Sequence, residues 1–191
     1  MQRVRLGLIG MALIGTAHAR TAQKVDECGL VAIADVDEKY REPTEELGAT
    51  YYRDYEEMIG RERLQGVVIA TPNHLHAPMG IACAERGLHL LVEKPITSNL
   101  ADADQIIDAA KRNNVRILVG HQRRFNARVE KARDVVRGGE LGKLVGATIT
   151  WALLKPAEYF EDPFTWRRNK GGGPILINLI HEIDNLRYIC G

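Results

Sequence analysis

The sequence predicts an α/β fold built on a doubly wound parallel sheet, followed by the beginning of a second α/β domain with an antiparallel sheet. Strand-like and helix-like segments alternate up to about residue 120, as is typical of parallel strands joined by crossover helices. A glycine-rich loop follows the first strand, and the pattern changes after residue 120. We therefore expect one domain over residues 1–120 and the start of another over residues 121–191 of the 191-residue chain.

Short apolar runs in the first 120 residues are predicted to be strands. The run Gly66–Ala70 is rich in β-branched residues, as expected for a strand that is buried on both faces. The predicted strands cover residues 4–9, 29–34, 51–52, 66–70, 88–92 and 115–119.

Helical spacing and capping residues place helices between these strands. Asp54 and either Ser98 or Asn99 are suited to cap helix N-termini, and Gly87 is suited to end a helix as its C′ residue. Pro43 interrupts one helical segment and can break it in two. The expected helices cover about residues 13–27, 37–47, 54–60, 77–86 and 98–113.

Beyond residue 120 we expect a charge-rich helix over residues 126–137, then a strand, then a second helix. Residues 144–154 alternate enough to predict a strand of a separate, antiparallel sheet. Pro174 suits the first turn of a helix that runs to about Cys190. Because one or two strands and a helix cannot close a sheet domain, we expect an incomplete second domain, in a fragment or an unusually short chain.

The composition argues against several classes of partner. The 26 basic and 25 acidic side chains leave a formal charge of +1, whereas nucleic-acid or membrane-surface binding usually needs a clearer basic excess. No apolar run approaches the roughly 18 residues of a membrane helix, and the N-terminus does not resemble a signal peptide. Cys28, Cys83 and Cys190 are too scattered for a disulfide framework, which favours free thiols and a cytoplasmic location.

The loop after the first strand predicts a dinucleotide site of the Rossmann type. Gly10 permits a tight turn, and Gly15 lets the following helix pack closely on the strand. Ala12 stands where the pattern usually has a glycine that lets the backbone approach the pyrophosphate. The loop N–H groups and the helix N-terminus would bind the phosphates. The loop residues expected to contact the cofactor are Gly10, Ala12, Leu13, Ile14 and Gly15.

An acidic residue at the end of the second strand strengthens this interpretation. Asp35 follows Gly15 by 20 residues, the position where a carboxylate accepts hydrogen bonds from the adenosine ribose hydroxyls. The same carboxylate would repel a 2′-phosphate. We therefore predict NAD as the cofactor, with NADP disfavoured.

Four further strings resemble a known family. They are Thr71-Pro72-Asn73-His74-Leu75-His76, Glu93-Lys94-Pro95, Gly120-His121-Gln122-Arg123-Arg124-Phe125-Asn126, and the triple glycine 171–173 followed by His181 and Asp184. In this order they resemble the glucose–fructose oxidoreductase, inositol dehydrogenase and MocA family over essentially the whole chain. The resemblance implies NAD(P)-dependent redox chemistry on sugars and polyols. It also implies a C-terminal domain whose open antiparallel sheet often makes a dimer contact, hence a homo-oligomer in the full-length form.

Lys94 and His181 are the candidate catalytic residues. Lys94 follows the carboxyl end of a parallel strand, where open α/β sheets bind ligands, and its ammonium could polarise the reacting oxygen. The family resemblance makes this lysine essential or nearly so, and matches His181 to the catalytic helix, where an imidazole could accept the hydroxyl proton. Four residues before the histidine, where the family usually has a carboxylate, this sequence has Ile177. Asp184 or another residue replaces it, or the proton chemistry differs.

Other polar residues complete the candidate site. His76 either contacts cofactor or substrate or caps the following helix, and Arg123 and Arg124 either bind substrate or form surface ion pairs. A metal site is disfavoured, because the spacing of His74, His76, Cys83 and His181 fits no standard pattern. Further cofactor candidates are Thr71, Pro72, Asn73, His76, Glu93 and Lys94. Substrate candidates are Lys94, Arg123, Arg124, Asn178 and His181.

The sequence thus predicts an NAD-dependent oxidoreductase acting on a secondary hydroxyl of a sugar, polyol or related cyclic compound. Two alternatives stay open. One is a redox-neutral lyase or hydrolase that uses NAD transiently, and the other is an NAD(P)-binding regulator without turnover. Retention of Lys94 and His181 argues against the regulator.

Overall fold

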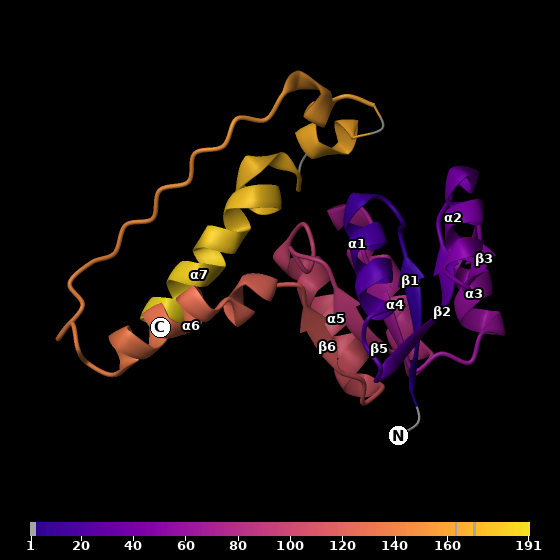
Figure 1. Ribbon diagram of the computed structural model, residues 1–191, viewed down its shortest axis with the longest axis horizontal. Coiled ribbons are helices and arrows are strands. Elements are labelled where there is room, and N and C mark those ends of the chain that lie inside the picture. Colours follow the sequence, from indigo (N-terminus) through magenta and orange to yellow (C-terminus); the bar gives the residue numbers. More distant parts are fainter. Residues whose placement is uncertain (1–2, 163, 170) are drawn as a thin grey trace. The chain divides into compact units, whose positions relative to one another are not determined.

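A six-stranded parallel sheet forms the centre of the first of two units into which the chain divides, Met1–Val119 and Gly120–Gly191 (Figure 1). The computed structural model describes residues 3–162, 164–169 and 171–191. The sheet order is β3-β2-β1-β4-β5-β6, so the order reverses between β1 and β4, at the switch point of a doubly wound sheet. The strands are β1 Val4–Ile9, β2 Cys28–Ala34, β3 Thr50–Tyr52, β4 Gly66–Ile69, β5 His89–Val92 and β6 Ile117–Val119.

Helices cover both faces of this sheet because successive strand residues point to opposite sides. On one face Ile69 packs in a buried cluster with Met58 and Ile106 of the covering helices. On the other face Leu8 and Val68 pack in a second cluster with α1. The first face carries α3 Tyr55–Arg61, α4 His76–Glu85 and α5 Leu100–Arg112; the second carries α1 Leu13–Ala22 and the turn and helix η1 Glu38–Tyr40 and α2 Arg41–Glu46.

The predicted capping residues act as expected. The Asp54 carboxylate accepts a hydrogen bond from the N–H of Glu56 at 2.8 Å. Asn99, rather than Ser98, caps α5, and its side chain accepts from the N–H of Asp102 at 3.0 Å. Gly87, with φ +75°, follows α4 in the left-handed conformation that glycine adopts without a Cβ penalty.

Two predicted helices differ in detail. The first ends at Ala22 instead of about residue 27. The segment around Pro43 does divide, but at Tyr40, into a 3-10 turn and α2. Pro43 occupies the first turn of α2, where a missing N–H costs no intrahelical hydrogen bond.

The second unit, Gly120–Gly191, is mainly helical among its described residues. Helices α6 Ala127–Arg137 and α7 Ile180–Cys190 pack side by side (Figure 1). A π-helical turn, η6 Ile175–Leu179, leads directly into α7. The 3-10 turns are η3 Gln122–Phe125, η4 Ala157–Phe160 and η5 Thr165–Arg168, while η2 Asn73–Leu75 belongs to the first unit.

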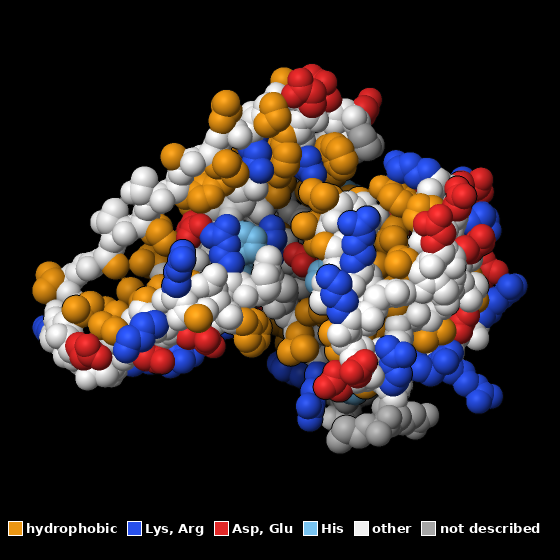
Figure 2. Space-filling model, viewed as in Figure 1, with side chains coloured by type: hydrophobic (Ala, Val, Ile, Leu, Met, Phe, Trp, Pro, Cys, Tyr) orange, Lys and Arg blue, Asp and Glu red, His pale blue; other side chains and the backbone are white. Residues whose placement is uncertain are grey.

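The prediction of a strand over residues 144–154 is wrong. This segment has no regular secondary structure, and the described part of the second unit contains no strand with which it could pair. Val145 and Leu154 are 98% and 90% exposed, and hydrophobic side chains are visible along this segment in Figure 2. Alternation indicates which residues could face a core, but a strand also needs a neighbouring backbone for its hydrogen bonds. Among the described residues, no helix is both long and apolar enough to cross a membrane.

The space around two helical glycines predicts opposite outcomes for the same substitution. A Cβ on Gly80 would lie 2.2 Å from Cδ1 of the fully buried Ile106, so we expect Gly80→Ala to destabilise the fold by about 1–3 kcal/mol. Gly60, exposed in α3, has open space around the same position, so Gly60→Ala should stabilise by about 0.5–1 kcal/mol. Urea unfolding measures both. Equal effects of the two substitutions would contradict the packing argument.

Candidate functional site

The glycine-rich loop between β1 and α1 makes two close backbone contacts. Gly10 has φ +91°, and a Cβ there would lie 2.8 Å from the carbonyl oxygen of Ala70 after β4. A Cβ on Gly15 would lie 1.8 Å from the carbonyl oxygen of Gly10. No side chain fits at either position, so the N-terminus of α1 is held at the switch point of the sheet.

This helix N-terminus is suited to bind a pyrophosphate. Ala12 occupies the N-cap position without a side-chain hydrogen bond to the first turn. The first N–H groups of a helix have no intrahelical acceptors, and with the helix dipole they favour an anionic ligand. Leu13 and Ile14 are 83% and 46% exposed beside them. The residues present therefore fit a dinucleotide, with Ala12 as the N-cap residue where the pattern usually has glycine.

Asp35 follows β2 with its carboxylate fixed by backbone donors. The N–H of Met11 donates to Oδ2 at 2.7 Å, and the N–H of Asp37 donates to Oδ1 at 2.9 Å. The hydroxyl of Tyr51 donates to the Asp35 carbonyl oxygen at 2.6 Å. A carboxylate oxygen can accept more than one hydrogen bond, so both oxygens of Asp35 have capacity left for ribose hydroxyls. Sequence reasoning missed Met11, since a contact made by a backbone N–H leaves no signal in residue type.

His76 lies between the loops that follow β4 and β5. Its side chain is fully buried, with Nδ1 2.9 Å from the carbonyl oxygen of Pro95 and Nε2 2.9 Å from that of Thr71. Burial lowers the pKa of His76. A neutral imidazole donates through one nitrogen only, so one of these two contacts carries the N–H. In the first unit the ring therefore has a structural contact that neither sequence interpretation had foreseen.

Glu93 holds the turn that carries Lys94. Its Oε1 lies 2.8 Å from Nε2 of His18 on α1, and its Oε2 accepts from the N–H of Lys94 at 3.2 Å. Burial alone would raise the pKa of Glu93, but the hydrogen bonds from His18 and Lys94 and the charges of both lower it below its usual value. Glu93 is thus a carboxylate at neutral pH. Its contact with His18 was missed by sequence reasoning; the available signal was a histidine one turn after Gly15.

A second carboxylate organises the unit Gly120–Gly191. Arg124 binds Asp184 through two nitrogens, with Nε donating to Oδ2 at 2.8 Å, and His121 Nδ1 lies 3.5 Å from the same oxygen. Burial alone would raise the pKa of Asp184, but Arg124 and the charges of His121 and His181 lower it. Arg123 pairs with Glu182 of α7. Both arginines thus have the acidic partners that sequence reasoning gave as the alternative to substrate binding.

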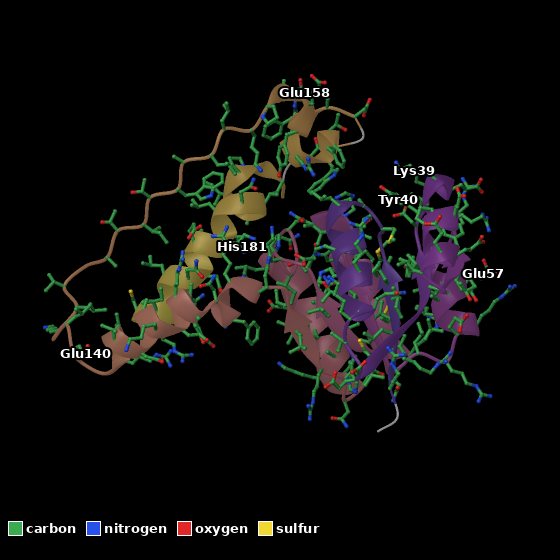
Figure 3. The ribbon with its side chains drawn as sticks, in the orientation of Figure 1. Lys39, Tyr40, Glu57, Glu140, Glu158 and His181 are labelled. Carbon is green, nitrogen blue, oxygen red and sulfur yellow. The ribbon has the colours of Figure 1, made fainter. Side chains whose placement is uncertain are left out.

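The helix geometry before His181 differs from the regular α-helix that the sequence suggested. Ile177 and Asn178 lie in the π-helical turn η6, where each turn contains more residues than in an α-helix. Successive side chains of an α-helix point about 100° apart around its axis. This angle therefore does not describe the relative orientation of Ile177 and Asn178. The amide of Asn178 donates to the hydroxyl of Tyr159 at 3.4 Å. His181 follows in the first turn of α7 (Figure 3).

The predicted site residues thus fall into groups within the two units. Gly10, Gly15 and Asp35 meet at one edge of the sheet, because parallel strands present their carboxyl ends on the same side. Lys94 follows β5 at that edge, whereas His181 belongs to the second unit. No group of three or more His, Cys, Asp or Glu suited to a metal ion occurs among the residues that the structure describes.

Comparison with known proteins settles the family. Residues 4–121 match the oxidoreductase family with an NAD-binding Rossmann fold, and residues 129–191 match the GFO/IDH/MocA C-terminal domain. The chain belongs to the Gfo/Idh/MocA oxidoreductase family. The resemblance noted from its motifs is therefore confirmed.

Relatives of this Gfo/Idh/MocA chain include proteins named as dehydrogenases and one named as a hydratase. It is 35% identical to myo-inositol 2-dehydrogenase of Thermotoga maritima, over 98% of this chain and 55% of that protein. It is 28% identical to 2,7-anhydro-N-acetylneuraminate hydratase of Mediterraneibacter gnavus, over 100% of this chain and 50% of that protein. The WlbA dehydrogenase of Bordetella pertussis, solved with NADH and UDP-GlcNAcA, matches with a TM-score of 0.89 and 27% identity, over 100% and 59% of the two chains. The chain spans about half the length of these relatives.

The contact between Gly15 and Gly10 predicts the effect of one added methyl group. We expect Gly15→Ala to weaken NADH binding at least about tenfold, because the helix must move away from the loop that is expected to bind the phosphates. Gly29→Ala is the matched control, since nothing lies within 4 Å of a Cβ at that position in β2. Titration of NADH fluorescence measures both. Unchanged affinity in Gly15→Ala would show that the loop adapts without cost.

The Asp184–Arg124 pair predicts a pH-dependent contribution to stability. A carboxylate whose folded pKa lies below its unfolded value stabilises the fold above the unfolded pKa and loses this contribution as pH falls through the folded pKa. We expect Asp184→Asn to cost about 1–3 kcal/mol at pH 7 and clearly less near pH 3. Asp134→Asn, at an exposed ion pair, should cost under about 1 kcal/mol. Denaturant unfolding at both pH values gives the answer, and a pH-independent cost for Asp184→Asn would contradict the pairing.

Proposed function

We propose that this chain forms the NAD-binding domain and the first part of the substrate domain of an NAD-dependent dehydrogenase. The enzyme transfers hydride between nicotinamide and a secondary hydroxyl of a sugar, an inositol-like polyol or a related cyclic compound. The observation that carries the proposal is the turn of Lys94, anchored by Glu93 at the same sheet edge as the glycine loop and Asp35. The names of the relatives support this substrate class.

The cofactor would be held by the groups at the carboxyl ends of β1, β2, β4 and β5. The N-terminus of α1 would bind the pyrophosphate, and Asp35 the adenosine ribose, as the fixed carboxylate favours NAD over NADP. The loop of Thr71, Pro72 and Asn73, after β4, would line the nicotinamide side. His76 would contribute through its contact with the carbonyl oxygen of Thr71, the first residue of that loop.

A bound nicotinamide would supply the acceptor or donor for the hydride of the substrate carbon. Lys94 would donate a hydrogen bond to the substrate oxygen and stabilise its alkoxide character as the hydride leaves. During oxidation His181 would accept the hydroxyl proton, and during reduction it would return that proton. The negative charge of Asp184 stabilises the protonated ring, since the two groups interact electrostatically.

Asn178, Arg123 and Arg124 are the remaining proposed substrate contacts. Asn178 adjoins the catalytic helix and already donates to Tyr159, so it can bind a hydroxyl only through its other polar positions. Arg124 uses two of its five N–H donors on Asp184, and Arg123 is paired with Glu182. We propose that both arginines mainly set the geometry of the second unit, which is compatible with a substrate contact through their other donors.

Transient use of NAD is the second candidate function. A relative that is 28% identical bears the name of a hydratase, which is a redox-neutral activity. Such a reaction would need the same hydride and proton transfers, followed by their reversal on the substrate. It would therefore consume substrate without accumulating NADH. A regulator without turnover is disfavoured because it has no use for Lys94 and His181.

We further propose the domain division at about residue 120, a cytoplasmic location and a homo-oligomeric full-length protein. The division agrees with the two units of the structure. The free cysteines Cys28, Cys83 and Cys190 support the location. The oligomer rests on the family resemblance.

Substitution of Lys94 tests the proposed function. The protein is incubated with NAD or NADP and a panel of polyols, sugars and hydroxy acids, while NADH and substrate loss are followed. We expect Lys94→Ala to lower turnover by at least about 100-fold and to leave NAD affinity nearly unchanged, because the lysine acts on the substrate oxygen. Lys24→Ala, an exposed lysine after α1, should behave as the unsubstituted protein.

The pattern of products separates the candidates. NADH that accumulates with one compound, preferentially from NAD, supports the dehydrogenase. Substrate loss without NADH supports transient redox chemistry. Tight NAD binding without any turnover across the panel would overturn both the dehydrogenase proposal and the proposal of transient NAD use.

A further inference from the structure

His18 links the helix at the cofactor loop to the turn of Lys94. It lies on α1, one turn after Gly15, and its Nε2 is 2.8 Å from Oε1 of Glu93. The side chains of His18 and Glu93 are 26% and 12% exposed, so water competes little for this contact. One side chain thus joins the first helix of the domain to the end of β5.

The direction of this hydrogen bond follows from the charge of Glu93. The pKa of Glu93 lies below its usual value despite burial, so the group is a carboxylate and can only accept. His18 must therefore donate from Nε2. If this donor is removed, a partly buried carboxylate oxygen loses its partner, and the carboxylate gains freedom to rotate away from the Lys94 N–H.

The helix packs closely against the end of β1. Gly15 packs against the Gly10 carbonyl with no room for a Cβ, which fixes α1 against the end of β1. The phosphate-binding N-terminus and His18 lie on this one rigid element. A hydrogen bond from His18 therefore holds the Lys94 turn in a defined position relative to the helix that would bind the cofactor.

We propose that His18 is a positioning residue. Through the Glu93 carboxylate it holds the backbone of Lys94 in a fixed position relative to the cofactor-binding helix. Its catalytic effect acts through Lys94 and rests on the proposed function. Its structural effect, the anchoring of the Lys94 N–H by Glu93, exists without cofactor or substrate. The two effects can therefore be measured separately.

The test compares three variants of the purified protein. His18→Ala removes the donor. His18→Gln places an amide N–H near the position of Nε2 and should rescue the contact. Arg20→Ala changes an exposed residue on the same helix and serves as the control. Thermal unfolding first establishes that all three variants are folded.

Hydrogen exchange of the Lys94 amide, measured by NMR without cofactor, reports on the anchoring. We expect exchange to be about 10- to 100-fold faster in His18→Ala, and close to the unsubstituted rate in His18→Gln and Arg20→Ala, because a hydrogen bond to a charged acceptor is lost only in the first. Equal protection of Lys94 in His18→Ala would overturn the proposal, whether or not the protein has any activity.

Kinetics and NADH titration then test the functional part. We expect kcat to fall about 10- to 100-fold in His18→Ala, with NADH affinity changed less than about threefold, and to recover in His18→Gln. An unchanged kcat in His18→Ala, or a loss that His18→Gln does not restore, would overturn the positioning role. If the unsubstituted protein turns over no substrate, the proposed function fails, and the exchange result alone decides whether His18 anchors the turn.

Discussion

The backbone of α1 lies so close to the Gly10 carbonyl that a Cβ at Gly15 would sit 1.8 Å from that oxygen. This approach brings the helix N-terminus, with its unsatisfied N–H groups, to the carboxyl end of β1 beside the switch point of the sheet. His18 lies one turn further along this helix and contacts Glu93, and the N–H of Met11 in the preceding loop donates to Asp35. The groups proposed to bind the phosphates and the ribose, and the anchor of the Lys94 turn, thus lie around one backbone contact.

Each unit contains a partly buried carboxylate that remains charged. Glu93 is held by His18 and a backbone N–H, and Asp184 by Arg124 with His121 nearby. Burial favours the neutral acid in both, yet both pKa values lie below the usual range because the hydrogen bonds and neighbouring charges outweigh desolvation. Both carboxylates fix a chain segment next to a proposed catalytic side chain. In each unit, the charged carboxylate therefore acts mainly by holding a neighbouring chain segment in place.

Local signals in the sequence were sufficient for most of the first unit. The caps Asp54 and Asn99 act over two or three residues, so residue type alone predicts Asp54 and limits the second cap to Ser98 or Asn99. The strand expected over residues 144–154 failed because pairing depends on a distant backbone. The π-helical turn 175–179 alters hydrogen bonding without a known residue signature. The contact of His18 spans 75 positions along the chain and becomes visible only when β5 and α1 are placed together.

The absence of a carboxylate at Ile177 changes how the proposed proton transfer is supported. Asp184 interacts electrostatically with His181, but Arg124 binds both oxygens of Asp184 and offsets part of its charge. A carboxylate shared with a guanidinium stabilises a protonated imidazole less than an unshared one would. In the proposed reaction, a larger share of the stabilisation of the substrate oxygen therefore falls to Lys94. If the proposed roles hold, the anchoring of the Lys94 turn by Glu93 would matter more in this chain than in one that has an acid at position 177.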